Sequence, residues 1–307
     1  MDRQGVIVGI HGLENKPPLD EKRRWWRQAI LEGLQRNCGV GADDLAFEFV
    51  YWADLRYDRP LAGDENKEPY RPGDGSGPFP RYDEPVSETS LNNTVLGHVY
   101  KGLDWVQTKT GVTPVDNVIL QNRFDDLWHY QSENSFARAV RARLRDVLER
   151  MAGQPILLVA HSMGSIIAYD TLRMLEREAP SVRVDHLVTL GSPLGLAEVR
   201  LKIVAENGAA RMPNNVGRWT NLADKRDLAA VVGELAEDFA PNDHGVGIRD
   251  AVVVNDYRRP AGGSNPHKSY GYLRTPEFSE IARDFAKGCS PAASELYETV
   301  QDDGARG

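Results

Sequence analysis

The chain has 307 residues, of which 41% are hydrophobic and 27% charged, so it can bury a substantial core and is neither fibrous nor wholly disordered. Its net charge of −8 argues against a nucleic-acid partner, because proteins that bind phosphate backbones usually carry a basic excess. The two cysteines, Cys38 and Cys289, lie far apart and give neither a disulfide framework nor the spacing of a metal site.

The N-terminal segment does not have the features of a secretory signal. Residues 1–5 lead directly into a short apolar run, without a charged start, a long apolar stretch or a small-residue cleavage site. No stretch of the chain approaches the roughly 20 apolar residues that a membrane span needs. We therefore expect a cytoplasmic protein with no membrane span, and the sequence leaves its oligomeric state open.

Short apolar segments alternate along the chain with segments of helical periodicity. The predicted strands cover residues 6–10, 47–52, 156–160, 186–190, 219–222 and 251–254. The predicted helices cover residues 22–34, 135–151, 165–178 and 276–287. Most of the strands are nearly continuous apolar runs, which is typical of strands buried on both faces of a parallel sheet. The alternation predicts an α/β fold, with a mostly parallel central sheet and helices on both faces.

Residues 55–131 interrupt this alternation. They are rich in Pro, Gly, Asp and aromatic residues, show little periodicity, and include the turn sequence Gly-Asp-Gly-Ser-Gly-Pro at 73–78. A segment of this length without regular structure is unusual in a compact domain and is often functional. We expect a single domain over residues 1–307, with an irregular insertion or cap-like excursion at about 55–131. Whether this excursion forms a mobile lid stays open.

The stretch from Pro155 to Ser165 is the most informative in the chain. An apolar strand pattern leads into Ala160-His-Ser162-Met-Gly164 and then directly into a helical pattern. A serine on such a strand-to-helix turn needs small neighbours two positions away, because larger side chains would collide with the adjacent elements. The turn lifts the hydroxyl above the edge of the sheet, and the positive end of the following helix favours an anionic intermediate. The pattern predicts Ser162 as a nucleophile; an ordinary serine in a strand-to-helix turn is the alternative.

Together with two further glycine-containing turns, this pattern resembles the α/β-hydrolase superfamily, and its lipase/esterase branch in particular. The first turn, His-Gly-Leu at 11–13, follows the first predicted strand, and the second, Gly-Ser-Pro-Leu-Gly, lies at 191–195. The resemblance implies an α/β-hydrolase fold and an oxyanion hole formed by the backbone N–H groups of Met163 and Leu13. We interpret the side chain of His11 as a brace for its loop.

The resemblance also implies where the acid of a catalytic triad lies, namely after a strand downstream of the serine. Asp224 and Asp227 both follow the predicted strand at 219–222. Lipase relatives tend to carry Asn-x-x-Asp-x-x-Asp here, with the later aspartate in the triad. We favour Asp227, with Asp224 as a helix cap or a loop ion-pair partner, and keep Asp224 as the alternative.

The base of such a triad is a histidine after the last strand. Of the seven histidines, His244 and His267 follow the candidate acids, and only His267 also follows the last predicted strand. The surrounding Pro-His-Lys-Ser-Tyr-Gly-Tyr at 266–272 is similar to the histidine loop of the family. We therefore predict His267 as the base, and the order Ser162, Asp227, His267 is the order that the fold requires.

These residues predict a serine hydrolase that cleaves an acyl ester through an acyl-enzyme, with no metal or organic cofactor. We expect the substrate to be a small-molecule or lipid-like acyl ester. A thioesterase, an amidase and a phospholipase share this chemistry and stay open, as does a non-catalytic binding protein that retains the fold. A dinucleotide-binding enzyme is disfavoured, because no Gly-x-Gly-x-x-Gly follows the first predicted strand.

Overall fold

A sheet of six parallel strands forms the centre of the computed structural model, which describes residues 5–41, 45–83, 126–230 and 234–289. Its spatial order is β2-β1-β3-β4-β5-β6. The strands are β1 (Val6–Ile10), β2 (Phe47–Val50), β3 (Ile156–His161), β4 (His186–Leu190), β5 (Trp219–Ala223) and β6 (Ile248–Val252). From β1 the chain adds β2 on one side and then β3 to β6 on the other. The boundary between β1 and β3 is therefore the topological switch point, where open parallel sheets bind their ligands.

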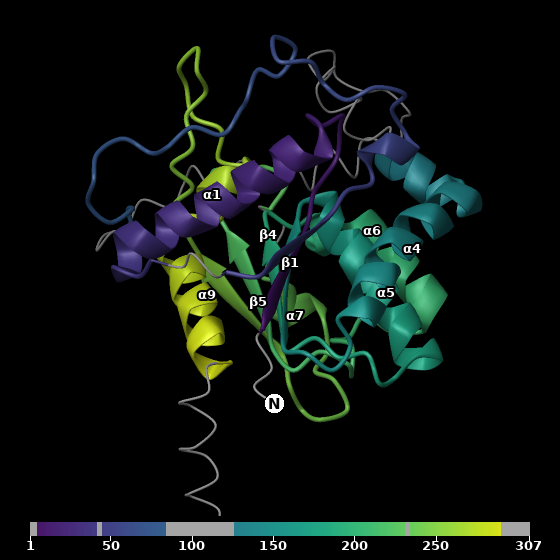
Figure 1. Cartoon of the computed structure of the whole chain (residues 1–307). Coiled ribbons are helices and arrows are strands. Elements are labelled where there is room, and N and C mark those ends of the chain that lie inside the picture. Colours follow the sequence, from purple (N-terminus) through teal and green to yellow (C-terminus); the bar gives the residue numbers. More distant parts are fainter. Residues whose placement is uncertain (1–4, 42–44, 84–125, 231–233, 290–307) are drawn as a thin grey trace, which may run out of the picture.

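Two helical layers cover the sheet (Figure 1). One face is covered by α1 (Leu19–Cys38), α8 (Ser269–Tyr272) and α9 (Pro276–Gly288). The other is covered by α4 (Asn134–Arg150), α5 (Met163–Glu178), α6 (Ala197–Asn207) and α7 (Leu235–Asp238). Two short 3₁₀ turns, η1 (Ala53–Leu55) and η2 (Pro193–Gly195), follow β2 and β4.

Alternation along the strands divides the core into two layers. In β1, Val8 and Ile10 pack into the cluster beneath α4 and α5, whereas Ile7 packs into the cluster beneath α1 and α9. All three side chains are at most 1% exposed, which contributes about 1.5–3 kcal/mol each by hydrophobic burial. Gly9 leaves room for the ring of Trp26, which would lie 2.8 Å from a Cβ at that position. This packing holds α1 close to β1 and fixes where the loop between them runs.

The α/β-hydrolase fold class predicted from the sequence is confirmed by this parallel sheet and its two helical layers. All six predicted strands exist, but the last prediction was misplaced: β6 covers Ile248–Val252 instead of 251–254. β6 is an edge strand whose middle residues are partly or fully exposed, so it can include Arg249 and Asp250. The apolar run at 251–254, on which the prediction was based, therefore overlaps only the C-terminal end of β6. The short elements α6, α7 and α8 were not predicted.

The irregular excursion expected at about 55–131 falls largely outside the described residues, which omit 84–125. Of its described residues, 56–83 contain no helix or strand, whereas 126–131 are helical and were not predicted to be so. Residues 56–83 run along the face that carries α1, where Arg36 donates to the carbonyl of Gly73 at 3.2 Å and its guanidinium lies 3.8 Å from the ring centre of Phe79. The single domain stays a prediction, and whether the excursion forms a lid stays open.

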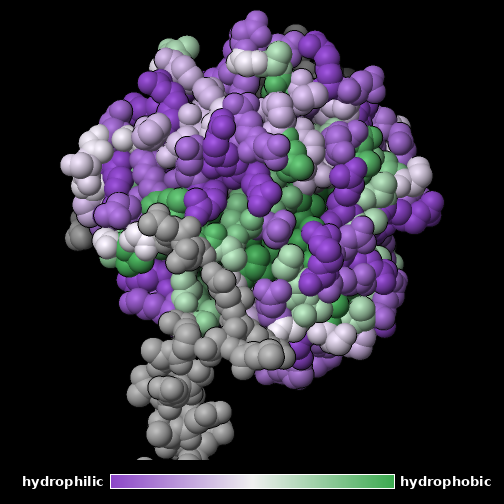
Figure 2. Space-filling model, in the orientation of Figure 1, coloured by the Kyte–Doolittle hydropathy of each residue, from purple (hydrophilic) through white to green (hydrophobic). Residues whose placement is uncertain are grey.

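The molecular surface is mainly hydrophilic on the face seen in Figure 2, and hydrophobic residues gather in its middle, between the two helical layers. No helix in the described ranges is long and apolar enough to cross a membrane.

Candidate active site

Ser162 stands on a tight turn between β3 and α5. Its backbone has φ 55° and ψ −130°, a conformation that is strained for a residue with a side chain and is found mainly where a surrounding structure enforces it. Gly164 makes the turn possible, because a Cβ there would lie 2.7 Å from the carbonyl oxygen of His11. The strand, the turn and the helix therefore present the Ser162 hydroxyl at the carboxyl end of the sheet.

The structure brings His267 and Asp227 to this serine. His267 Nε2 lies 3.0 Å from Ser162 Oγ, and His267 Nδ1 lies 2.9 Å from both carboxylate oxygens of Asp227. With Nδ1 donating to the carboxylate, Nε2 is left as the acceptor for the serine hydroxyl. Asp227 is 1% exposed and Ser162 4% exposed, so the chain of hydrogen bonds is shielded from water.

Asp227 is held by further contacts. The Tyr272 hydroxyl donates to Asp227 Oδ2 at 2.7 Å, and the Ala229 backbone N–H donates to Oδ1 at 3.0 Å. Gly191, with φ 54°, allows the carboxylate to approach, because a Cβ there would lie 2.6 Å from Asp227 Oδ2 and 3.2 Å from His267 Nδ1. Asp227 is therefore fixed in orientation before any substrate arrives.

Asp224, the alternative acid, has other partners. Its carboxylate accepts two hydrogen bonds from the Arg226 guanidinium, at 2.9 and 2.6 Å, and one from the Asn255 backbone N–H at 2.7 Å. Its own backbone N–H donates to the Tyr272 hydroxyl at 3.0 Å. Asp224 thus ties the loop after β5 to the segment after β6, and the hydroxyl of Tyr272 links the two aspartates.

His244, the alternative base, lies in the loop that precedes β6, at the amino end of the parallel sheet. Ser162 and His267 follow the carboxyl ends of β3 and β6, at the opposite edge. The topology therefore separates His244 from the serine.

His161 positions the loop that carries His267, a role that sequence reasoning missed. Its Nε2 lies 2.7 Å from the His267 carbonyl oxygen, so Nε2 carries the proton and donates to it. Burial, and then the nearby charge of His267, lower the pKa of His161 well below the ordinary histidine value, so its ring is neutral at pH 7. The residue that precedes the serine therefore also holds the backbone of His267 in place.

The loop after β1 lies directly against the serine. A Cβ on Gly12 would lie 2.6 Å from Ser162 Cβ and 3.1 Å from its Oγ. His11 braces this loop, as the sequence indicated: its Nε2 accepts from the Trp52 backbone N–H at 3.1 Å, and its Nδ1 lies 2.8 Å from the Gly12 carbonyl oxygen. Burial, followed by the charge of Lys16, lowers the pKa of His11 well below its usual value, which keeps the ring neutral.

The two predicted oxyanion donors flank this contact. Met163 is the first residue of α5, so its backbone N–H has no acceptor within the helix. Leu13 lines the same cavity as Ser162, and none of the backbone hydrogen bonds in the described ranges uses its N–H. Both groups are therefore available to an oxygen bound next to Ser162.

A small cavity of about 60 Å³ opens beside Ser162. Charged side chains line it, and they come from three parts of the chain. The lysines are Lys16, Lys22 and Lys268, and the carboxylates are Glu14 and Glu68. None of these five residues was singled out from the sequence, because each reads there as an ordinary surface charge.

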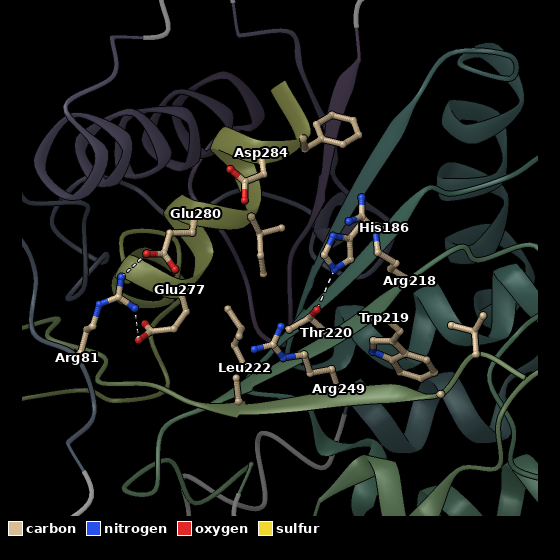
Figure 3. A pocket seen from close by; sticks show the side chains of 15 residues that line it. Arg81, His186, Arg218, Trp219, Thr220, Leu222, Arg249, Glu277, Glu280 and Asp284 are labelled. Carbon is tan, nitrogen blue, oxygen red and sulfur yellow. Dashed lines mark hydrogen bonds and ion pairs between the residues drawn. The ribbon is translucent and has the colours of Figure 1, made fainter. Parts of the chain in front are cut away.

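A larger cavity, of about 510 Å³, lies between α9 and β4 to β6 (Figure 3). Several of its polar groups contact one another: Arg81 contacts Glu277 at 3.3 Å and also Glu280, and His186 Nε2 lies 2.9 Å from Thr220 Oγ1. His186, Trp219 and Gly247 place this cavity toward the amino ends of the strands. Catalytic groups of parallel α/β sheets gather at the carboxyl ends, so we assign the candidate active site to the smaller cavity at Ser162.

No group of three or more His, Cys, Asp or Glu residues that could hold a metal ion occurs in the described ranges. The arrangement at Ser162 places a hydroxyl, an imidazole and a carboxylate in hydrogen-bonded sequence, which is the set of groups that nucleophilic catalysis by a serine requires.

The model of the lecithin:cholesterol acyltransferase family matches residues 101–208, which include β3, Ser162 and α5. None of the curated proteins compared with the chain matches it. The crystal structure of a candidate hydrolase from Agrobacterium vitis S4 is similar at 16% sequence identity and a TM-score of 0.27, covering 48% of this chain and 68% of the other.

Proposed function

We propose that this chain, an α/β-hydrolase by its fold and its family resemblance, is a serine hydrolase that cleaves an acyl ester through an acyl-enzyme. The observation that carries the proposal is the unbroken chain of hydrogen bonds from Ser162 Oγ through the His267 ring to Asp227, at 3.0 and 2.9 Å. A serine hydroxyl is a weak nucleophile until a neutral imidazole accepts its proton, and this geometry provides that acceptor.

The first half of the reaction forms the acyl-enzyme. Ser162 Oγ attacks the ester carbonyl carbon while its proton moves to His267 Nε2, and the Asp227 carboxylate stabilises the resulting imidazolium. The carbonyl electrons move to the oxygen, which accepts hydrogen bonds from the N–H groups of Met163 and Leu13. Each such donor is worth about 3 kcal/mol in the transition state. Collapse of the intermediate breaks the ester C–O bond, and His267 protonates the departing alkoxide.

The second half releases the acid. A water molecule gives its proton to His267 Nε2 and attacks the acyl carbon, and the serine leaves with that proton. Replacing this water with an alcohol turns the same intermediate into an acyl transfer, and the name of the matching family favours this as the second candidate. Thioester and amide cleavage follow the same steps and differ only in the leaving group. A non-catalytic binding protein is disfavoured by the preserved geometry.

The proposal predicts that Ser162→Ala removes ester hydrolysis. With 4-nitrophenyl esters of graded chain length, we expect kcat to fall about 10⁴-fold or more, because removing a triad nucleophile leaves only binding and oxyanion stabilisation. The matched control is Ser132→Ala, at an exposed serine whose hydroxyl donates to the Trp128 carbonyl. Turnover that survives in Ser162→Ala, or that is lost equally in both variants, would contradict the proposal.

A further inference from the structure

We infer that the substrate carries a negatively charged group, a carboxylate or a phosphate, close to its scissile ester, and that Lys22 binds this group. The inference rests on the proposed function of Ser162 and extends it to the class of substrate. It comes from the charged lining of the cavity at Ser162, which neither the fold nor the triad requires.

Three lysines converge on this cavity from separate elements. Lys16 lies in the loop after β1, Lys22 in the first turn of α1, and Lys268 next to His267. Leu13 is the only hydrophobic side chain among the described residues that line the cavity. A cavity of about 60 Å³ with such a lining suits a compact anionic group and not a long acyl chain.

Of the three lysines, Lys22 provides the strongest evidence for an anionic ligand, because its ammonium group is buried. It is only 4% exposed, and its Nζ donates to the Tyr270 hydroxyl at 3.0 Å and lies 4.4 Å from the centre of that ring. No ion pair within the described ranges joins it to a carboxylate. A buried ammonium that no carboxylate contacts directly is unfavourable, and an anion in the cavity would provide such a contact.

The electrostatics of Lys22 agree with this geometry. Burial, followed by the positive charges of Lys268 and Lys16, lowers the pKa of Lys22 well below the ordinary lysine value. A bound anion would act in the opposite direction and favour the ammonium form. Lys22 therefore gains more from an anionic ligand than an exposed lysine would.

The nearby carboxylates offset the charge of the cluster only in part, and Glu68 acts on Lys22 more weakly than burial and the two other lysines do. Glu68 is already bonded to Lys268 at 3.0 Å and to Arg259 and Asn265 at 2.7 Å each. Burial alone would raise the pKa of Glu68, but Lys268 and these hydrogen bonds outweigh it and lower the pKa to about 2. Its charge is thus shared with Arg259 outside the cavity. Glu14, the other acid, is exposed.

The test uses matched esters that differ only in charge. For the carboxylate arm, mono-4-nitrophenyl glutarate is compared with its methyl ester; for the phosphate arm, acetylated glycerol phosphate is compared with acetylated glycerol. We expect the wild type to prefer the charged member of at least one pair by about tenfold or more in kcat/KM, as one charge-assisted hydrogen bond provides. The arm with the larger preference identifies the anion.

Lys22→Met keeps the apolar stem and removes the charge, so it should reduce this preference by about fivefold or more. The matched control is Lys287→Met, which makes the same charge change at an exposed position near the end of α9 and should leave the preference unaltered. An equal rate for charged and capped esters in the wild type, or a preference that survives in Lys22→Met, would overturn the inference.

Binding measured without turnover separates this inference from the proposed function. Inorganic phosphate and glutarate should raise the melting temperature of the wild type, and do so less for Lys22→Met than for Lys287→Met. Binding that depends on Lys22 in a protein that cleaves no ester would sink the hydrolase proposal and support the anion site. Ester cleavage without a preference for charged esters and without binding of phosphate or glutarate would support the hydrolase proposal and overturn the anion site.

Discussion

Asp224 and Asp227 are three residues apart, carry the same functional group and are both buried, yet they have different tasks. Asp227 faces the His267 ring, whereas Asp224 is occupied by Arg226 and by the Asn255 backbone. The Tyr272 hydroxyl bridges the two residues, donating to one side chain and accepting from the other backbone. At the scale of single residues, orientation and not chemical type decides which of the two carboxylates bonds to the His267 ring.

Matched amide substitutions test this division. Asp227→Asn should lower kcat about 10³- to 10⁴-fold with little change in fold, because an amide stabilises the wrong tautomer of His267. Asp224→Asn should instead lower the free energy of unfolding by about 1–3 kcal/mol, since it weakens hydrogen bonds to a charged guanidinium. Ester kinetics and urea unfolding of both variants measure the two effects. A larger loss of kcat in Asp224→Asn than in Asp227→Asn would reverse the assignment.

At the scale of elements, the site forms where the loop after β1 meets the turn between β3 and α5. The two strands are hydrogen-bonded neighbours, with Ile10 paired to Ala160, so the segments that follow them leave the sheet side by side. Gly12 and Gly164 allow these segments to touch. The close approach of these two segments therefore follows from the pairing of β1 with β3 and from the lack of side chains at Gly12 and Gly164.

Gly12→Ala tests this contact. The added methyl group would lie 2.6 Å from Ser162 Cβ, so either the loop or the serine must move. A displacement of this kind should reduce kcat/KM about 100-fold. The control is Gly41→Ala, because a Cβ at Gly41 meets nothing closer than 4.0 Å. Circular dichroism would check that both variants fold, and unchanged kinetics in Gly12→Ala would contradict the account.

Local patterns were enough to predict most of these elements and the serine itself. A buried strand, a turn and a helix follow one another within 155–178, so their signal needs no distant partner. The choice between Asp224 and Asp227 rested on resemblance, because both lie in one loop and only the position of His267 separates them. The bracing roles of His161 and Tyr272 could not be predicted, since each depends on a contact across more than 40 residues of sequence.

The charged cavity was missed for a related reason. Lys22 lies in the first turn of an amphipathic helix, and Glu68 lies in an irregular segment, where charged residues usually face solvent. Their meeting at Ser162 depends on how α1 and the segment after β2 pack around the site. Long-range packing of this kind leaves no periodicity in the sequence.

At the scale of the whole molecule, buried histidines tie stability to pH. Burial is the main cause that lowers the pKa of His11 and His161, and it lowers the pKa of His186 to about 4. Below about pH 6.5 the unfolded chain binds protons at these rings that the native protein does not bind. The histidines therefore contribute their full share to the free energy of unfolding above this pH, and that contribution falls as the pH decreases. Asp170 opposes the trend, because burial raises its pKa to about 6.

Urea unfolding at pH 7.5 and pH 5.0 measures this effect. Below its unfolded pKa, each of the three histidines should lower the free energy of unfolding by about 1.4 kcal/mol for every pH unit. Asp170 should offset a contribution about as large as that of one histidine. His186→Gln should make the dependence shallower, since it removes one of the titrating groups. An unfolding free energy that stays constant or rises toward pH 5.0 would contradict the assignment of neutral buried rings.

The central claim, that Ser162 is an activated nucleophile, is tested most directly by covalent labelling. The protein is treated with an uncharged fluorophosphonate, and the adduct is located by mass spectrometry of its peptides. The account predicts one phosphonylated residue, Ser162, with labelling lost in Ser162→Ala and strongly slowed in Asp227→Asn. An unlabelled wild type, or an adduct on another residue that persists in Ser162→Ala, would contradict it.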